Sequence, residues 1–292
     1  MGLTGLTSRP AWLRLCDHPA GVEITVVYLA WAGAGSSPLE QFAASLARHP
    51  AGADHRLAVV WKGFEEQPEA LEAAQALLAG VADMQLHIPP DGLDLVSYRR
   101  AADLVSGDVL CFLNTSSVVL ADDWLGLLAR HLTGEVGIVG ATGSWESPLS
   151  GSRGPRRLLR RGRYPAFPNP HLRTNAFLLR RETLHELWWP AVFTKGQAWE
   201  LESGMRSLTR QIEQRGLQPV VVGRDGVAYP RERWAASDTF RRAGQDNLLV
   251  ADNRTRQFSE ATGRQRRRLT RLAWGDPPGS MAPSALGQGV PA

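Results

Sequence analysis

Cysteine and long apolar runs are both scarce in this 292-residue sequence. Only Cys16 and Cys111 are present, too few for a disulfide framework, which favours buried free thiols in a reducing compartment. No apolar run approaches the ~20 residues of a membrane-spanning helix, and residues 1–19 lack the apolar core of a signal peptide. These absences predict a cytoplasmic protein and leave peripheral contact with the inner face of a membrane open.

Acidic residues are missing from one long stretch, residues 147–181. Six arginines crowd into part of it: Arg153, Arg156, Arg157, Arg160, Arg161 and Arg163. Interleaved with apolar residues, such a segment binds phosphates, an anionic lipid or an acidic glycan, although a solvated loop has the same composition. The net charge of the chain is only +4, so nucleic acid is not the expected partner. A second cluster is better explained as a helix face or tail: Arg264, Arg266, Arg267, Arg268 and Arg271.

Several signatures of catalytic sites are absent as well. The chain has no Walker loop, no Gly-x-Ser-x-Gly elbow and no Cys-x-x-Cys pair, and its histidines are scattered. Gly33-x-Gly35-x-x-Pro38 has the position of a dinucleotide-binding turn, with Glu65 or Glu66 as the ribose-binding acid. Its third glycine is missing and Pro38 would obstruct close packing of helix on strand, so a plain turn before a helix explains the residues better.

Alternating strands and helices are what the sequence does contain. Strands are predicted at 24–29, 57–61, 84–88, 109–113 and 136–139, and helices begin near Ser37, Pro68, Leu95 and Asp122. Ser37 and Asp122 are the expected N-caps of the first and last of these helices. This alternation predicts an α/β protein with a mostly parallel central sheet and helices on both faces.

The second half of the chain is less regular. Strands are expected at 175–179 and 220–222, and helices at 182–188, 203–215 and 246–251. We expect an irregular lead-in over 1–21, one domain over 22–273 that divides into two halves near residue 145, and a disordered tail over 274–292.

An apolar strand that ends abruptly in polar residues is the main candidate for a site. Val109–Leu113 is followed directly by Asn114, Thr115 and Ser116. In open α/β sheets ligands bind beyond the carboxyl ends of the strands, so these side chains are placed where chemistry is usual. Carboxylates, which a divalent metal would favour, are absent there. A simple strand-to-helix turn remains the alternative.

A pair of carboxylates is the second candidate. Glu200 and Glu202 stand in Trp199-Glu200-Leu201-Glu202-Ser203-Gly204. At a helix N-terminus the helix dipole would stabilise such carboxylates, which is a structural role. Facing a sugar hydroxyl, one of them would instead serve as a general base.

Taken together, residues 22–250 resemble the GT-A glycosyltransferases, and in particular the family-2-like bacterial enzymes. Four segments in order carry the resemblance: the first strand with its glycine turn; Asp91-Gly92-Leu93-Asp94 followed by Tyr98-Arg99-Arg100-Ala101-Ala102; Phe112–Ser116 followed by Asp123-Trp124-Leu125; and Glu200–Gly216 followed by Val220-Val221-Val222. The resemblance implies a Rossmann-like GT-A fold. It also implies transfer of a sugar from a UDP- or GDP-linked donor to the hydroxyl of a glycan or lipid-linked acceptor.

Roles for individual residues follow from the same resemblance. Glu202 would be the base that deprotonates the acceptor, with Glu200 as the second choice. The nucleotide-sugar would be lined by Asp91, Asp94, Tyr98, Asn114 and Ser116. Mn²⁺ or Mg²⁺ is the cofactor that such enzymes use at an Asp-x-Asp motif.

This sequence departs from that pattern because Asn114-x-Ser116 stands where the family has Asp-x-Asp. Either a metal is held weakly with help from elsewhere, or the enzyme needs none, or catalysis has been lost. Arginines such as Arg160, Arg161 and Arg173 would then bind the diphosphate or the acceptor and replace the metal's charge. The alternative is a non-catalytic protein of the same fold whose arginine-rich segment binds an anionic glycan, lipid or nucleic acid.

Overall fold

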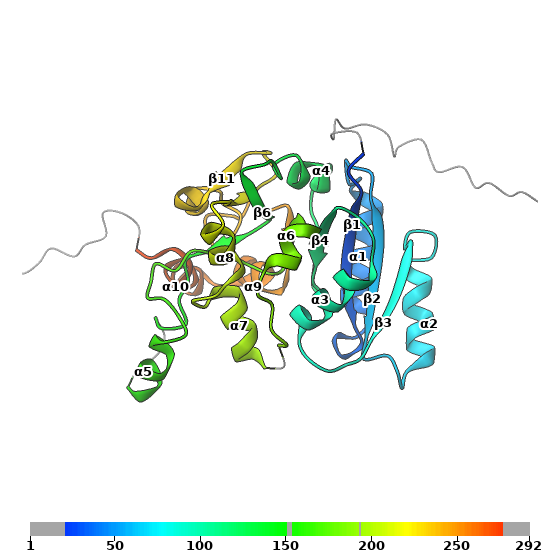
Figure 1. Ribbon diagram of the computed structural model, residues 1–292, viewed down its shortest axis with the longest axis horizontal. Helices are drawn as coiled ribbons and strands as arrows, with labels where there is room; N and C mark the ends of the chain where they lie inside the picture. The colour runs from blue at the N-terminus through cyan, green and yellow to red at the C-terminus, as the bar shows by residue number, and fades with distance from the viewer. Residues whose placement is uncertain (1–20, 151–153, 193, 277–292) are drawn as a thin grey trace, which may run out of the picture.

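The expected fold class is confirmed by the computed structural model, which describes residues 21–150, 154–192 and 194–276 (Figure 1). An eight-stranded sheet has the order β11-β10-β6-β9-β4-β1-β2-β3. Its strands are β1 (Ile24–Trp31), β2 (Arg56–Lys62), β3 (Met84–Ile88), β4 (Val109–Leu113), β6 (Val136–Gly140), β9 (Ala176–Arg180), β10 (Gln218–Val222) and β11 (Ala228–Pro230). Most of the lead-in, Arg153 and the tail from residue 277 lie outside the described residues.

Parallel pairing dominates the sheet. The pairs β1–β2, β2–β3, β1–β4 and β6–β10 are parallel, whereas β9 runs antiparallel to both of its neighbours, β4 and β6. Because β9 comes from the second half of the chain, it joins the two halves in one sheet. Two short ribbons add to it: β5 (Val118–Val119) pairs with β12 (Val250–Ala251), and β7 (Gly143–Ser144) pairs with β8 (His171–Leu172).

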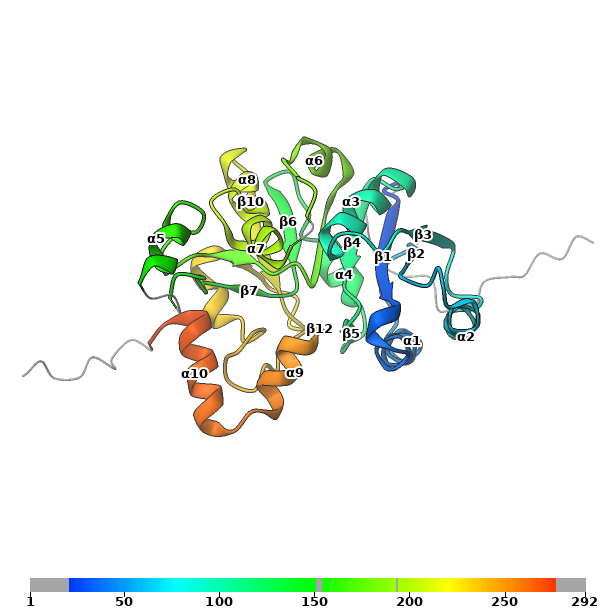
Figure 2. The same ribbon diagram turned by 90° about the horizontal axis from the view of Figure 1, so that it is seen from below.

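Helices cover both faces of the sheet (Figure 2). One face packs against α1 (Ser37–Arg48), α2 (Pro68–Leu77) and α4 (Trp124–Ala129). The other packs against α3 (Asp94–Leu104), α6 (Arg181–Glu186), α7 (Lys195–Ser203), α8 (Leu208–Gln214) and a 3-10 helix over Arg231–Ala236. The last helices in the described part of the chain are α9 (Asn253–Glu260) and α10 (Gly263–Trp274). No helix in the described part of the chain has the length and apolarity to span a membrane.

The sheet is apolar on both faces at its centre, as continuous apolar runs dictate. All five residues of β4 are buried, including Cys111, a free thiol whose pKa burial raises to about 12. On one face Tyr28 stacks on Phe42 of α1, with ring centroids 3.7 Å apart. Burial of this continuous apolar surface is the main stabilising contribution to the fold.

Several local predictions are wrong in detail. The helix expected over 203–215 begins only at Leu208, as α8, and residues 204–207, with Gly204 extended, separate it from α7, a helix over Lys195–Ser203 that was not predicted. Residues 246–251 are not helical, and α9 begins only after them, at Asn253. Neither Ser37 nor Asp122 caps a helix, because α1 has Ser36 at its N-cap and α4 has Asp123, in a left-handed conformation. The acid-free arginine segment forms a short helix, α5 (Pro155–Arg161), and the second arginine cluster lies on α10, as expected.

Candidate active site

The turn after β4 uses its polar residues to hold its own backbone. Asn114 Oδ1 accepts hydrogen bonds from the Ser116 N–H (3.0 Å) and the Ser117 hydroxyl (3.1 Å). The Tyr28 hydroxyl donates to the Thr115 carbonyl (2.9 Å), and Arg256 donates to the Ser116 carbonyl (3.1 Å). The Asn114 amide is therefore an Asx-type cap, placed at the carboxyl edge of the sheet.

This turn does not suit the Mn²⁺ or Mg²⁺ that the Asp-x-Asp position implies. Both ions prefer several hard oxygen ligands, usually with carboxylate charge. Asn114 offers one neutral oxygen that already accepts two hydrogen bonds, and Ser116 offers a hydroxyl. Among the residues that the structure describes, no group of three or more histidine, cysteine or acidic side chains is arranged to hold a metal.

Glu202 is held directly beside the β4 turn. The Asn114 N–H donates to the Asn175 carbonyl (3.0 Å), which places the segment before β9 next to the turn. From that segment Thr174 donates twice to Glu202 Oε2, through its N–H (3.2 Å) and its hydroxyl (2.5 Å). Glu202 lies in the last turn of α7, so the dipole at a helix N-terminus does not account for it.

A cavity of about 340 Å³ opens at Glu202. Five arginines line it: Arg160, Arg173, Arg241, Arg254 and Arg268. Only two carboxylates, Glu146 and Glu202, line it with them. Arginines therefore outnumber carboxylates in the lining, an excess of positive charge that favours an anion.

Two of these arginines are buried and fixed. Arg173 Nη2 lies 2.6 Å from Asp252 Oδ2, and Arg241 Nη1 lies 3.1 Å from Glu146 Oε2. Both guanidinium groups stack on the Phe240 ring, at 4.2 and 4.9 Å from its centroid. Arg241 also has a left-handed backbone (φ 46°) and a buried Nε without a hydrogen-bond partner in the described structure. Backbone strain and an unsatisfied buried donor tend to occur at functional sites. Their combination in Arg241 makes this residue a candidate for ligand binding.

The remaining three arginines come from separate elements. Arg160 is on α5 and donates to the Pro148 carbonyl (3.2 Å), Arg254 is in the first turn of α9, and Arg268 is on α10. Arg161 follows Arg160 on α5 but is exposed and is not among the residues that line the cavity. Glu200 also lies elsewhere, near Tyr164, where burial and then the Glu200 charge raise the pKa of the phenol.

His171 forms part of the cavity wall. It is 5% exposed, and its Nδ1 lies 2.8 Å from the Asn169 carbonyl. Burial lowers the pKa of this imidazole, and the nearby Glu202 carboxylate opposes that shift. A neutral imidazole beside a carboxylate is a further candidate for proton transfer.

The residues expected to line the nucleotide are spread over the other half of the edge. Asp91 is exposed and makes a two-pronged ion pair with Arg100 (2.6 and 2.9 Å), which lowers the pKa of its carboxyl. Asp94 is exposed at the start of α3. Tyr98 is fully buried instead, packed against Phe112 and Phe177, so its ring cannot reach a ligand without a rearrangement of the core.

Lys62 lies near Asp91 and Asp94 and was not predicted from the sequence as a site residue. It ends β2, is 4% exposed, and donates from Nζ to the Gly92 carbonyl (2.6 Å). Burial lowers the pKa of its amine, while Asp94 and Asp91 oppose that shift. The sequence pattern could have indicated it, because Lys62 ends an apolar strand much as Asn114 directly follows one.

A second hollow of about 390 Å³ lies at the end of β1, between α1 and α2. Trp31 and Phe64 line it, and Thr115 of the β4 turn reaches it. The β4 turn is thus flanked by an aromatic hollow on one side and, through Thr174, by the arginine-lined cavity on the other.

Comparison with known proteins adds a likeness of fold. No protein-family model matches the chain, and no curated protein matches it. Among solved structures it is similar to a mannosyltransferase from Pyrobaculum calidifontis in complex with GDP-Man and Mn²⁺, at 13% identity and a TM-score of 0.43, over 74% of this chain and 59% of that one.

Two further solved structures are similar to the chain. One is glucosyl-3-phosphoglycerate synthase from Mycobacterium tuberculosis in complex with phosphoglyceric acid, at 18% identity and a TM-score of 0.45, over 73% of both chains. The other is 4-diphosphocytidyl-2C-methyl-D-erythritol synthase from Anaerococcus prevotii, at 12% identity and a TM-score of 0.41, over 62% of this chain and 84% of that one. This chain spans about 59% of the length of the mannosyltransferase.

Proposed function

We propose that this protein is a glycosyltransferase that moves a sugar from a nucleotide-diphosphate sugar to an acceptor hydroxyl. The observation that carries the proposal is Glu202, held by Thr174 at the carboxyl edge of the sheet and facing a cavity lined by five arginines. A fixed carboxylate beside concentrated positive charge is what such a transfer needs, because a proton is removed at one point while a diphosphate leaves at another.

Glu202 is the proposed base. Both hydrogen bonds from Thr174 go to Oε2, and no described residue bonds Oε1, so that oxygen is left for the acceptor. The acceptor hydroxyl gives its proton to Glu202 as its oxygen bonds to the sugar's anomeric carbon. The bond from that carbon to the diphosphate oxygen breaks, and its electron pair leaves with the diphosphate.

Arginine supplies the charge that stabilises the leaving diphosphate in this proposal. Arg173 and Arg254, which both line the cavity, are the candidates for this role. Arg173 directly precedes Thr174 in the chain, and Arg254 lies two residues after Asp252, the ion-pair partner of Arg173. Guanidinium groups fixed by packing and ion pairs offer paired donors for phosphate oxygens at little reorganisation cost. Asn114, Thr115 and Ser116 offer no carboxylate to a metal, so the arginines are proposed to supply this positive charge in its place.

The donor half is proposed to lie along the carboxyl ends of β1, β2 and β4. The aromatic hollow at Trp31 and Phe64 would take the base by stacking, and Lys62 with Asp91 and Asp94 would face the ribose or phosphates. The donor is a UDP- or GDP-linked sugar, and the acceptor is a glycan or a lipid-linked glycan.

The proposal is tested by assaying release of UDP or GDP from a panel of nucleotide-sugars, with EDTA and with Mn²⁺ in parallel. We expect that either UDP or GDP is released from its nucleotide-sugar and that this release persists in EDTA. Binding of a nucleotide is followed separately by thermal shift, since a ligand that binds only the folded state raises the midpoint. Full dependence on Mn²⁺ would remove the arginine-based step. A shift with polyanions and none with any nucleotide would favour the non-catalytic anion-binding alternative.

A further inference from the structure

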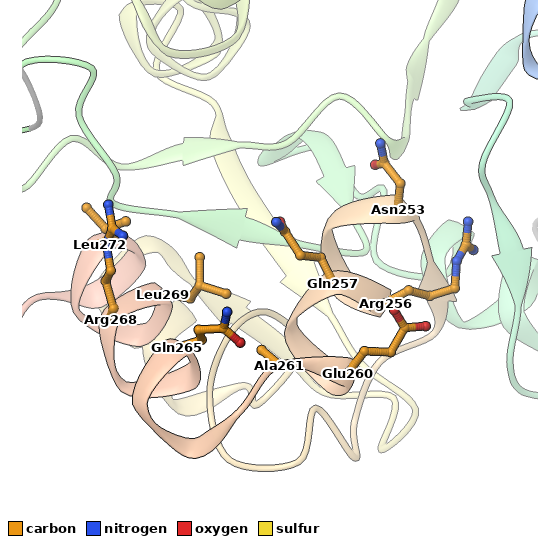
Figure 3. A pocket seen from close by; sticks show the side chains of 9 residues that line it. All are labelled: Asn253, Arg256, Gln257, Glu260, Ala261, Gln265, Arg268, Leu269 and Leu272. Atoms are coloured by element: carbon orange, nitrogen blue, oxygen red, sulfur yellow. The ribbon is translucent and has the colours of Figure 1, made fainter.

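A groove between α9 and α10 is a feature that the proposed chemistry leaves unused. It has a volume of about 600 Å³ and is lined by nine residues of α9, α10 and the turn between them (Figure 3). The helix pair is anchored from beneath, because Phe258 and Trp274 are buried and the Trp274 indole donates to the Phe240 carbonyl (2.7 Å). Capping boxes at Asp252 and Thr262 fix the start of both helices. The groove is therefore preformed.

Three of the nine lining residues carry side-chain amides. Asn253 and Gln257 are exposed, lie one turn apart on α9, and make no side-chain hydrogen bond within the described structure. Opposite them, Gln265 of α10 uses its Oε1 to accept from Thr262 and keeps its Nε2 as a donor. A carboxamide both donates and accepts, which matches a hydroxyl group that does the same.

Two leucines form the apolar part of the groove. Leu269 and Leu272 are half-buried on α10, and Leu269 and Gln257 extend into the space between the helices (Figure 3). Six of the nine lining residues are polar or charged: Asn253, Arg256, Gln257, Glu260, Gln265 and Arg268. A hydrocarbon chain would desolvate those groups without replacing their hydrogen bonds, whereas a sugar ring offers hydroxyls to the amides and C–H faces to the leucines.

The groove borders the cavity at Glu202. Arg268 and Leu272, one turn apart on α10, line both spaces. A chain molecule lying along α9 and α10 would therefore enter the cavity past these two side chains.

We propose that the α9–α10 groove is a subsite for an oligosaccharide chain, whose terminal sugar is presented to the Glu202 cavity. The inference rests on the proposed function for its biological meaning, since the chain in the groove would be the body of the acceptor. Binding of the chain itself needs neither donor nor catalysis.

The test is direct binding of the full chain of this protein, without any nucleotide-sugar, to a printed array of hexose, hexosamine and uronic acid oligomers in α and β linkages, from monosaccharide to hexasaccharide. Affinity for at least one series is expected to rise at least about tenfold from monosaccharide to tetrasaccharide as the groove fills. Gln257→Ala and Leu269→Ala should remove most of that gain. Gln214→Ala, an exposed glutamine at the end of α8, is the matched control and should retain it.

Results of three kinds separate the possibilities. A gain in affinity with chain length on the array would support this proposal even if no nucleotide-sugar were consumed in the transfer assay, so the two proposals fail separately. The proposal is overturned if no oligosaccharide on the array binds better than its monosaccharide, or if Gln257→Ala and Gln214→Ala behave alike. Binding to phosphatidylglycerol vesicles in place of any oligosaccharide would also overturn it.

Discussion

Arg173 and Asp252 form a buried ion pair, with Nη2 and Oδ2 2.6 Å apart and side chains only 11% and 1% exposed. The pair joins the segment before β9 to the N-terminus of α9, because Asp252 also caps that helix by accepting from the N–H groups of Arg254 and Thr255. One wall of the arginine-lined cavity thus depends on a single carboxylate.

Asp252→Asn should destabilise the protein by about 3–5 kcal/mol, because the amide can still cap α9 while Arg173 is left as an uncompensated buried charge. Urea unfolding of the wild type and the variant measures the difference. The double variant Asp252→Asn/Arg173→Met should recover part of the loss. A single-variant loss below about 1 kcal/mol would show that the pair behaves as a solvent-exposed one.

The same carboxylate predicts acid sensitivity. Burial by itself would raise the pKa of Asp252, yet the charge of Arg173 and the hydrogen bonds from Arg173 and Thr255 outweigh it and hold the pKa below the ordinary 3.8. A carboxyl whose pKa is lower in the folded state stabilises that state above the unfolded pKa, and this contribution is lost as pH falls through the folded value. The wild type should therefore lose stability more steeply than Asp252→Asn below about pH 4. Parallel curves from unfolding at graded pH would contradict this.

Glu202→Gln should lower the rate of sugar transfer by about two to four orders of magnitude and leave nucleotide binding intact, because the amide oxygen can accept from Thr174 but cannot take a proton. Steady-state kinetics with a thermal-shift control for donor binding separate the two effects. Glu200→Gln gives the comparison between the two carboxylates. If Glu200→Gln lowered the rate of sugar transfer more than Glu202→Gln does, Glu200 would be the base.

Arg254→Gln should weaken binding of the nucleoside diphosphate by about tenfold, since a guanidinium that lines the cavity is replaced by a neutral side chain. Arg267→Gln is the matched control on α10, because Arg267 is exposed and not among the residues that line the cavity. Isothermal titration of both variants in EDTA provides the measurement. Equal affinities would exclude Arg254 from the diphosphate site.

Tyr98→Phe should stabilise the protein by about 1 kcal/mol, because the Tyr98 hydroxyl is buried and has no hydrogen-bond partner in the described structure. Burial also raises the pKa of this phenol well above its ordinary value, so it stays neutral. Nucleotide affinity should not change, since the ring packs against Phe112 and Phe177. A loss of affinity in titration would return Tyr98 to the nucleotide site.

The fold and the position of Asn114 in the site could be predicted, because both depend on the local pattern of apolar and polar residues. Apolar runs such as Val109–Leu113 read as buried strands, and alternation with helices implies a parallel sheet whose carboxyl edge holds the polar residues. Asn114 was therefore predicted at that edge, whereas Lys62, which ends β2 at the same edge, was not. Helix boundaries were predicted less well: the helix expected from residue 203 begins at Leu208, where Ser207 caps it by accepting from the Arg210 N–H.

Which arginines surround Glu202 was decided only by the tertiary structure. The dense cluster at 153–163 drew attention, yet Arg161 is exposed and Arg160 is joined in the cavity by Arg241, Arg254 and Arg268 from the far end of the chain. Arg173 and Asp252 are 79 positions apart, and no periodicity connects them. The sequence determined the layers because burial of apolar faces is a local property, whereas the charge around the site depends on long-range contacts that exist only after those layers have packed.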